Sequence, residues 1–192
     1  MTGGNRFANA PYENLGEQKT EGMDFNLNWG AEFADMGLGA VPGTLLLNWE
    51  LNWLWKYDIQ NLPGGQVLEY AGTESGPAGN AFRYKMYTTL TWANSWGSLG
   101  LTWQHLPGAK DASVVVTPTS VTHGASSYDE FNLFGTWKVT PAYEIRAGVD
   151  NLFDRDPNVV GAIPGVTNAL GSTLADYDVL GRRFYVGVRA RF

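Results

Sequence analysis

Hydrophobic and polar residues alternate through seven stretches of this chain. In the clearest stretch, residues 45–57, leucine, tryptophan and tyrosine fill the odd positions, while asparagine, glutamate and lysine fill most even positions. A period of two places successive side chains on opposite faces of a β-strand, and no stretch of ten residues shows the helical period of 3.6. The other alternating stretches are residues 23–33, 82–92, 98–104, 130–139, 143–150 and 183–192. The pattern predicts an all-β chain with about seven strands.

Two kinds of connection join the predicted strands, and they take turns along the chain. The short connections are rich in Gly, Pro or Asn, and the long ones also contain many Ser and Thr residues. In an antiparallel up-and-down sheet, this order places every long loop at one end and every short turn at the other. Outer-membrane barrels have this asymmetry, with long extracellular loops and short periplasmic turns. The short connections are residues 34–42, 94–96 and 140–141, and the long ones are residues 59–81, 106–127 and 155–181.

The apolar face of the predicted sheet could form a soluble core or meet lipid. It carries most of the eight tryptophans, whereas the core of a soluble β-sandwich favours valine, isoleucine and leucine. Aromatic residues also gather at strand ends, as at Phe82 and Trp92. At the usual tilt of membrane strands, ten residues rise about 25 Å, which is the height of an apolar band between two aromatic girdles. The pattern therefore favours a transmembrane β-barrel segment over a soluble fold.

Composition argues against several other classes. A net charge of −6 and a pI near 4.8 disfavour nucleic-acid binding through phosphate neutralisation. The absence of cysteine excludes disulfides and thiolate metal sites.

The sequence contains no His-Glu-x-x-His spacing, nucleophile elbow or phosphate-binding loop, so we expect no enzyme activity, no cofactor and no metal site. The acid pairs at 154/156 and 176/178 are expected to be solvated at strand ends. No apolar run approaches the roughly 18 residues of a membrane-spanning helix, and any export signal is expected to lie outside this chain.

Three motifs, in this order, give the chain a family resemblance. They are "YENLGEQKTEGMDFNLNW" at 12–29, "EIRAGVDNLFDRDP" at 144–157 and "YDVLGRRFYVGVRARF" at 177–192. They resemble TonB-dependent outer-membrane receptors, in which the penultimate strand ends in Asn-Leu-Phe-Asp and a basic residue, and the last strand runs from Gly-Arg to a terminal Phe. The resemblance covers nearly the whole chain. It implies location in a Gram-negative outer membrane and uptake of a scarce ligand: a siderophore, cobalamin or an oligosaccharide.

A full receptor of this family also has a plug domain, a TonB box and a barrel of about 22 strands. We therefore expect residues 1–192 to be the C-terminal part of such a barrel, incomplete and without the plug domain or TonB box. The expected partners are outer-membrane lipid, the barrel-assembly machinery, a small-molecule ligand, and the missing plug domain and TonB complex. Two alternatives stay open: a small stand-alone barrel acting as an adhesin or passive pore, with residues 1–21 as an eighth strand, and a soluble carbohydrate-binding β-sandwich.

Candidate functional residues fall into three groups. The polar face would line the lumen through Asn26, Asn28, Asn48, Glu50, Asn52, Arg83, Arg146 and Arg189. Side chains in or beside the long loops with suitable chemistry for a sugar or chelate are Glu69, Tyr70, Asp111, His123 and Tyr128. The resemblance implies that the last strand is an assembly signal, carried by Phe184, Val186, Val188 and Phe192.

Overall fold

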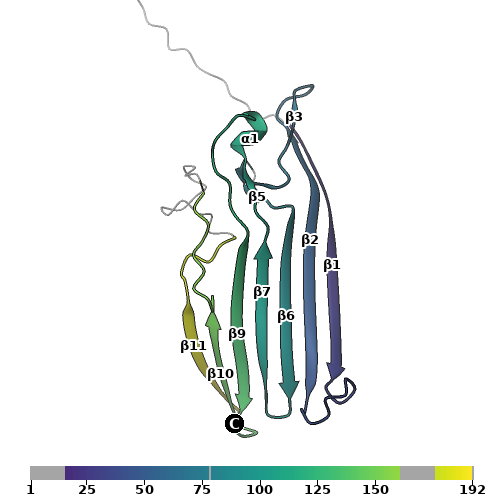
Figure 1. The fold of residues 1–192 in the computed structure, drawn as a ribbon, viewed down its shortest axis with the longest axis vertical. Helices are drawn as coiled ribbons and strands as arrows, with labels where there is room; N and C mark the ends of the chain where they lie inside the picture. Colours follow the sequence, from purple (N-terminus) through teal and green to yellow (C-terminus); the bar gives the residue numbers. More distant parts are fainter. Residues whose placement is uncertain (1–15, 78, 161–175, 192) are drawn as a thin grey trace, which may run out of the picture.

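One antiparallel up-and-down sheet dominates the computed structural model, which describes residues 16–77, 79–160 and 176–191 (Figure 1). The sheet is open, and β1 and β11 form its two edges. The short strand β3 (Val67–Glu69) joins it by pairing with the end of β2. The prediction of seven strands in chain order is confirmed. In spatial order they are β1 (Glu17–Glu32), β2 (Thr44–Gln60), β6 (Tyr84–Asn94), β7 (Gly97–Leu106), β9 (Tyr128–Lys138), β10 (Tyr143–Asp150) and β11 (Arg183–Ala190).

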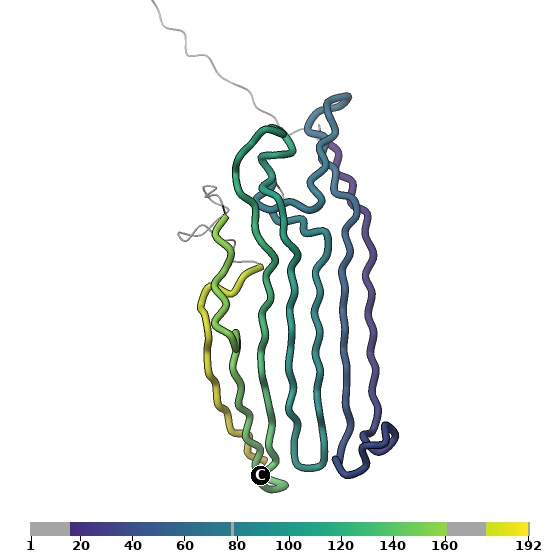
Figure 2. Tube along the Cα trace, viewed as in Figure 1, coloured from purple at the N-terminus to yellow at the C-terminus, as the bar shows by residue number. Residues whose placement is uncertain are grey.

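The connections separate to opposite ends of the sheet, as predicted (Figure 2). Those after β1, β6 and β9 are the short ones, and they lie at the same end as the C-terminus. Those after β2, β7 and β10 are long and lie at the other end. The alternative in which residues 1–21 supply an eighth, barrel-closing strand is wrong for residues 17–21, because these residues belong to β1. Within the described residues, β1 does not pair with β11, and no strand lies between them to close the barrel.

The strand register sorts side chains into an apolar face and a polar face. Residues that pair across antiparallel strands point to the same side. One row across four strands is all leucine, and the next row is all amide or hydroxyl. The rows are Leu47, Leu90, Leu101 and Leu133 on the apolar face, and Asn48, Thr89, Thr102 and Asn132 on the polar face. Many apolar side chains stay exposed, including Leu27 at 50% and Phe184 at 76%. So large an apolar surface is typical of a face that meets lipid.

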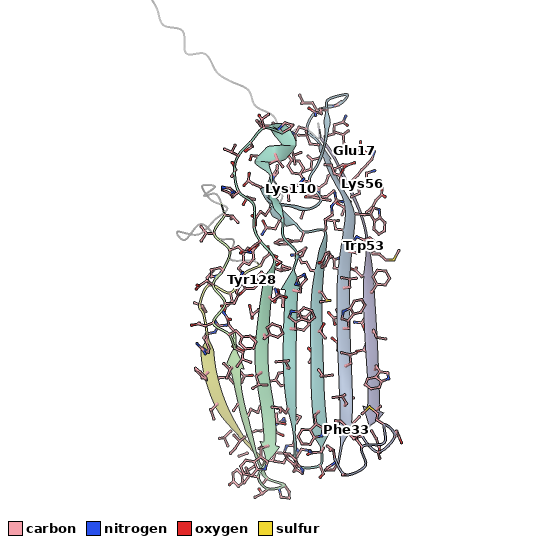
Figure 3. The ribbon with its side chains drawn as sticks, viewed as in Figure 1. Glu17, Phe33, Trp53, Lys56, Lys110 and Tyr128 are labelled. Atoms are coloured by element: carbon pink, nitrogen blue, oxygen red, sulfur yellow. The ribbon has the colours of Figure 1, made fainter. Side chains whose placement is uncertain are left out.

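A β-bulge ends the apolar face on β1 and β2. Glu21 pairs with Lys56 but Gly22 pairs with Leu54, so Trp55 is an extra residue on β2. Beyond the bulge, Lys56 lies on the same side as Glu21, 3.4 Å from its carboxylate, and Tyr57 turns to the polar face. The sequence pattern placed these two β2 residues on the opposite faces, so that assignment is wrong. On this side of the sheet, the bulge therefore marks the change from the tryptophan side chain of Trp53 to the charged side chain of Lys56, and Figure 3 labels both residues along β2.

Aromatic pairs occupy both ends of the apolar face. At the short-turn end, the rings of Trp92 and Trp96 meet edge to face at 5.4 Å between centroids. At the long-loop end, Trp103 stacks on Phe131 with an interplanar angle of 2°. Beside that stack, Asp129 accepts a hydrogen bond from the Trp103 indole and lies 2.8 Å from His105 Nδ1. Rings with a polar edge in this position are typical of the boundary between lipid and water.

Close strand contacts depend on glycine at the start of β7. A Cβ atom added to Gly97 would overlap the carbonyl oxygen of Thr136 on β9, and backbone cannot move aside as a flexible side chain can. Gly187, in the middle of β11, has open space around the same position.

Gly97→Ala is therefore expected to destabilise the folded sheet by about 2 kcal/mol through overpacking. Gly187→Ala is the matched control and should leave the sheet as stable or raise its stability by up to about 1 kcal/mol. Urea unfolding of the chain in detergent micelles, followed by tryptophan fluorescence, measures both. Equal midpoints for the two variants would show that the β7–β9 contact is not as close as described.

Candidate functional site

The three long loops pack on one another into a second layer at one end of the sheet. A three-stranded sheet, in the order β5-β4-β8, joins two of these loops. Strands β4 (Thr73–Gly76) and β5 (Gly79–Ala81) come from the loop after β2, and β8 (Lys110–Asp111) comes from the loop after β7. A single helical turn, α1 (Ser113–Val116), follows β8; within the described chain, no helix is long and apolar enough to cross a membrane. The sequence predicted only irregular loops here.

A buried aromatic cluster binds the third long loop to the other two. Tyr177, from the loop before β11, packs edge to face against Phe82 at 6.4 Å and against Tyr128 at 5.1 Å between ring centroids. All three rings are buried, with exposures of 4% or less. Phe82 was expected to open a strand on the apolar face, which is wrong, because the chain bends before β6 and turns this ring into the loop layer.

Glu74 lies fully buried at the centre of this layer. One carboxylate oxygen, Oε2, accepts a hydrogen bond from the Tyr177 hydroxyl at 3.4 Å, while Oε1 makes no hydrogen bond within the described chain. Its β8 partner, Asp111, is also acidic. The pKa of Glu74 is raised to about 7, mainly by burial; the Tyr177 hydrogen bond opposes this shift and the Asp111 charge adds to it. The packed loops therefore favour the neutral acid at this position.

The residues before β11 form a strap across the polar face. Asp176 holds it by accepting hydrogen bonds from Lys85 Nζ at 2.6 Å and Asn80 Nδ2 at 2.7 Å. Asp178 accepts a hydrogen bond from Arg183 at 2.7 Å. Both aspartate side chains are only 10% exposed, so the expectation that they are solvated is wrong. No group of three or more acidic or histidine side chains in the described residues is arranged to hold a metal ion.

A recess of about 500 Å³ opens beside the strap on the polar face. Its polar side chains could donate hydrogen bonds to a hydroxylated or chelating solute, or accept hydrogen bonds from it. They belong to β2, β6, β7 and the strap, namely Glu50, Asn52, Lys85, Tyr87, Gln104 and Asp176.

The five residues predicted to bind ligand do not gather at one surface. Glu69 and His123 are exposed, and Glu69 pairs with Arg83 at 3.0 Å. Tyr70, Asp111 and Tyr128 are buried in the loop layer, with exposures of 5% or less. The Asp111 carboxylate accepts a hydrogen bond from the Ser113 amide, and the Tyr128 hydroxyl donates one to Glu130. In this arrangement the buried three support the loops, and ligand contact stays a prediction for the exposed two.

The predicted lumen-facing asparagines lie together along the paired strands β1 and β2. Asparagines on β1 and β2 form a ladder, in which Asn48 donates to Asn28 at 2.8 Å and Asn52 donates to Asp24 at 2.6 Å. Asn26 donates a hydrogen bond to Glu50 at 3.4 Å and accepts one from the Asn28 side-chain amide.

The arginines of that group lie elsewhere. Arg83 lies in the bend before β6, at the long-loop end, where it donates to the Trp55 carbonyl oxygen. Arg146 and Arg189 lie on β10 and β11 towards the short-turn end. Sequence reasoning missed Glu74, Tyr177, Lys85 and Asp176, which no local pattern distinguishes from ordinary loop and strand residues.

Glu74 makes loop packing dependent on pH. Because the packed loops bind its proton more tightly than open loops with the ordinary pKa of 4.5, packing is most stable below pH 4.5 and loses about 3 kcal/mol as the pH rises through about 7. The hydrogen–deuterium exchange protection factors of residues 72–76 and 109–112, which correct for the intrinsic rise of amide exchange with pH, should therefore fall across this range. Glu74→Gln removes the charge, leaves Asp111 and Asp176 in place, and should flatten the profile. An identical profile in the variant would contradict this role.

Comparison with known proteins places the fold in context. Residues 1–152 match the family described as TonB dependent receptor-like, beta-barrel. The chain is 27% identical to the ferric enterobactin receptor of Pseudomonas aeruginosa, over 97% of its own length, and 22% identical to the ferrienterobactin receptor of Escherichia coli K12, over 94%. It spans 23% of the length of each of these relatives.

Solved structures agree with the sequence matches. Two structures of mutants of the ferric enterobactin receptor from P. aeruginosa superpose with a TM-score of 0.57, at 25% and 27% sequence identity. They cover 90% and 89% of this chain, and the chain covers 22% of each. The family match spans most of the chain, and the strand order, loop asymmetry and apolar face are those of an outer-membrane barrel wall. The chain belongs to the TonB-dependent receptor-like β-barrel family of outer-membrane proteins.

Proposed function

We propose that this chain is the C-terminal barrel wall of a receptor that imports a ferric siderophore by TonB-dependent transport. The observation that carries the proposal is the alignment of 97% of the chain with a ferric enterobactin receptor. A plug domain and the TonB complex would act together with this wall, as the family resemblance implies. We propose binding and transport, and no catalytic step, for the described residues.

Each part of the wall has a distinct role in this proposal. The exposed side chains of Glu69 and His123 are the candidates for ligand contact at the long-loop end. The asparagine ladder and the strap-side recess would line the path of the ligand. On β11, the side chains of Phe184, Val186 and Val188 are 70% to 76% exposed and would serve as the assembly signal together with Phe192, which lies outside the described residues.

Uptake of radioactive iron as a ferric siderophore tests the proposal. Iron-starved cells that carry the gene should take up the ferric siderophore with saturation kinetics, and deletion of the gene should remove this uptake. Labelled cobalamin and a labelled maltooligosaccharide are parallel substrates. If the cells take up either of these compounds, and deletion of the gene does not change iron uptake, the imported ligand is that compound and not a ferric siderophore.

The same assay separates ligand contact from loop packing. Glu69→Gln combined with His123→Ala should raise the half-saturating ligand concentration about threefold to tenfold, as expected for one or two lost hydrogen bonds. Val121→Ala is the matched control, because Val121 is 89% exposed in the same loop as His123. Equal effects of the control and the double variant would argue against direct contact.

A further inference from the structure

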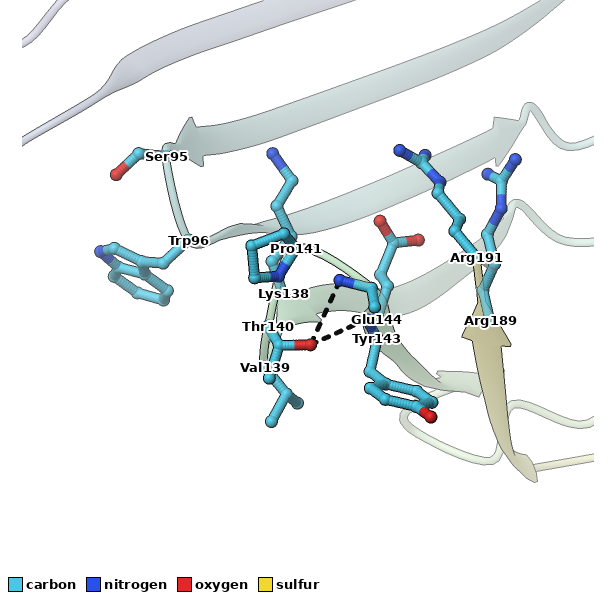
Figure 4. Close-up of a pocket in the computed structure, with 11 residues that line it drawn as sticks. Ser95, Trp96, Lys138, Val139, Thr140, Pro141, Tyr143, Glu144, Arg189 and Arg191 are labelled. Atoms are coloured by element: carbon cyan, nitrogen blue, oxygen red, sulfur yellow. Dashed lines mark hydrogen bonds between the residues drawn. The ribbon is translucent and has the colours of Figure 1, made fainter.

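Three cations that form no ion pair with any described residue gather on the polar face at the short-turn end of β9, β10 and β11. We call this surface the basic platform, formed by Lys138, Arg189 and Arg191. Figure 4 shows the three side chains rising to one side of the strands, while Tyr143 and Val139 point to the other side. They line a recess of about 330 Å³ together with the short turn between β9 and β10.

The single carboxylate in the recess does not neutralise the basic platform. Glu144 is the register partner of both Lys138 and Arg189, yet its Oε1 pairs with Arg146 Nε at 3.0 Å. Among the described residues, the three cations of the basic platform form no ion pair, whereas Lys85, Arg83 and Arg183 at the long-loop end are each paired. Glu144 also interacts electrostatically with Arg189 and Arg191, but one carboxylate shared with Arg146 does not balance the three exposed cations, so the surface stays positive and attracts an anionic partner.

We propose that the basic platform binds an extended acidic peptide segment at the periplasmic end of the lumen. The spacing of the cations favours a peptide over a single small anion. Lys138 and Arg189 lie two strands apart, about 10 Å, and Arg191, directly after the end of β11, lies two residues from Arg189, about 7 Å along the extended chain. Carboxylates at alternate positions of an extended chain point to the same side and lie about 7 Å apart, which matches the separation of Arg189 and Arg191. One phosphate would instead need these cations to converge on it.

The face on which the basic platform lies argues against a lipid headgroup. The neighbouring residues that point to the apolar face are Trp137, Val139 and Tyr143, which are 45% to 56% exposed and carry no positive charge. The cations alternate with them on the opposite side of the sheet. An acidic peptide on the lumen side therefore fits both the charge and the orientation, and this inference does not depend on which ligand the receptor imports.

Binding of a labelled peptide to the whole 192-residue chain in nonionic detergent micelles tests the inference. The probe is an eight-residue peptide with aspartate at every second position, measured by fluorescence anisotropy. The variant K138Q/R189Q/R191Q should bind it at least tenfold more weakly, and affinity for the unaltered chain should fall as salt rises. The matched control is K19Q/K110Q/R182Q, which removes the same charge from the long-loop end and should bind as the unaltered chain does.

Four results would overturn the inference. They are equal binding of the same peptide with asparagine in place of aspartate, equal loss in the control variant, full displacement by equimolar inorganic phosphate, and full displacement by phosphatidylglycerol added to the micelles. Far-UV circular dichroism and tryptophan fluorescence of each variant establish that it is folded. If the triple variant does not fold, Arg189→Gln alone should weaken binding about threefold to tenfold, and unchanged binding would overturn the inference equally.

Discussion

Every backbone amide and carbonyl group inside lipid must find a hydrogen-bond partner in protein, and this constraint governs the whole sheet. It accounts for the six ladders that join β1 to β11, whose register is unbroken from β2 to β11. Because that register is continuous, the leucine row through Leu47 and Leu133 stays on one face over four strands, and the amide and hydroxyl row stays on the other. The open edges of β1 and β11 carry the same requirement, so in lipid they need partner strands.

The end of the apolar band has a structural cause on β1 and β2. These strands have 16 and 17 residues, far longer than the roughly 9 to 11 that cross a bilayer. The bulge at Trp55 changes the facing of every β2 residue beyond it, which places Lys56 opposite Glu21 on the side that lower down meets lipid. Such exposed ion pairs add little stability. Their importance is positional, since they confine the apolar surface to the part of the wall that lipid covers.

Sequence alternation predicts most of this wall because lipid on one side and water on the other impose a period of two. The predicted strand at 98–104 is found at Gly97–Leu106, and the one at 130–139 is found at Tyr128–Lys138. The bulge could not be predicted, because Trp55, Lys56 and Tyr57 keep an alternating pattern through it. The loop layer could not be predicted either. Its strands have two to four residues, and its parallel pair joins two separate loops.

The loop layer depends on contacts between residues far apart in sequence. Tyr177 reaches Glu74 over 103 positions, and Asp176 reaches Lys85 over 91. These contacts bury a carboxyl group beside a tyrosine and close a strap over the polar face, next to the recess proposed to line the ligand path. The candidate site therefore follows from the fold of the loops. Tyr128, which the sequence suggested as a ligand contact, is buried in this layer and packs against Tyr177.

The assignment of one face to lipid and the other to water is most directly tested by cysteine labelling, since the chain has no cysteine of its own. Single cysteines would replace Leu47, Leu90 and Leu101 on the apolar face, and Asn48, Thr89 and Thr102 on the polar face. In proteoliposomes, a water-soluble maleimide should label the second set rapidly and the first set slowly. Equal labelling of the two sets, or faster labelling of the leucine positions, would contradict the assignment.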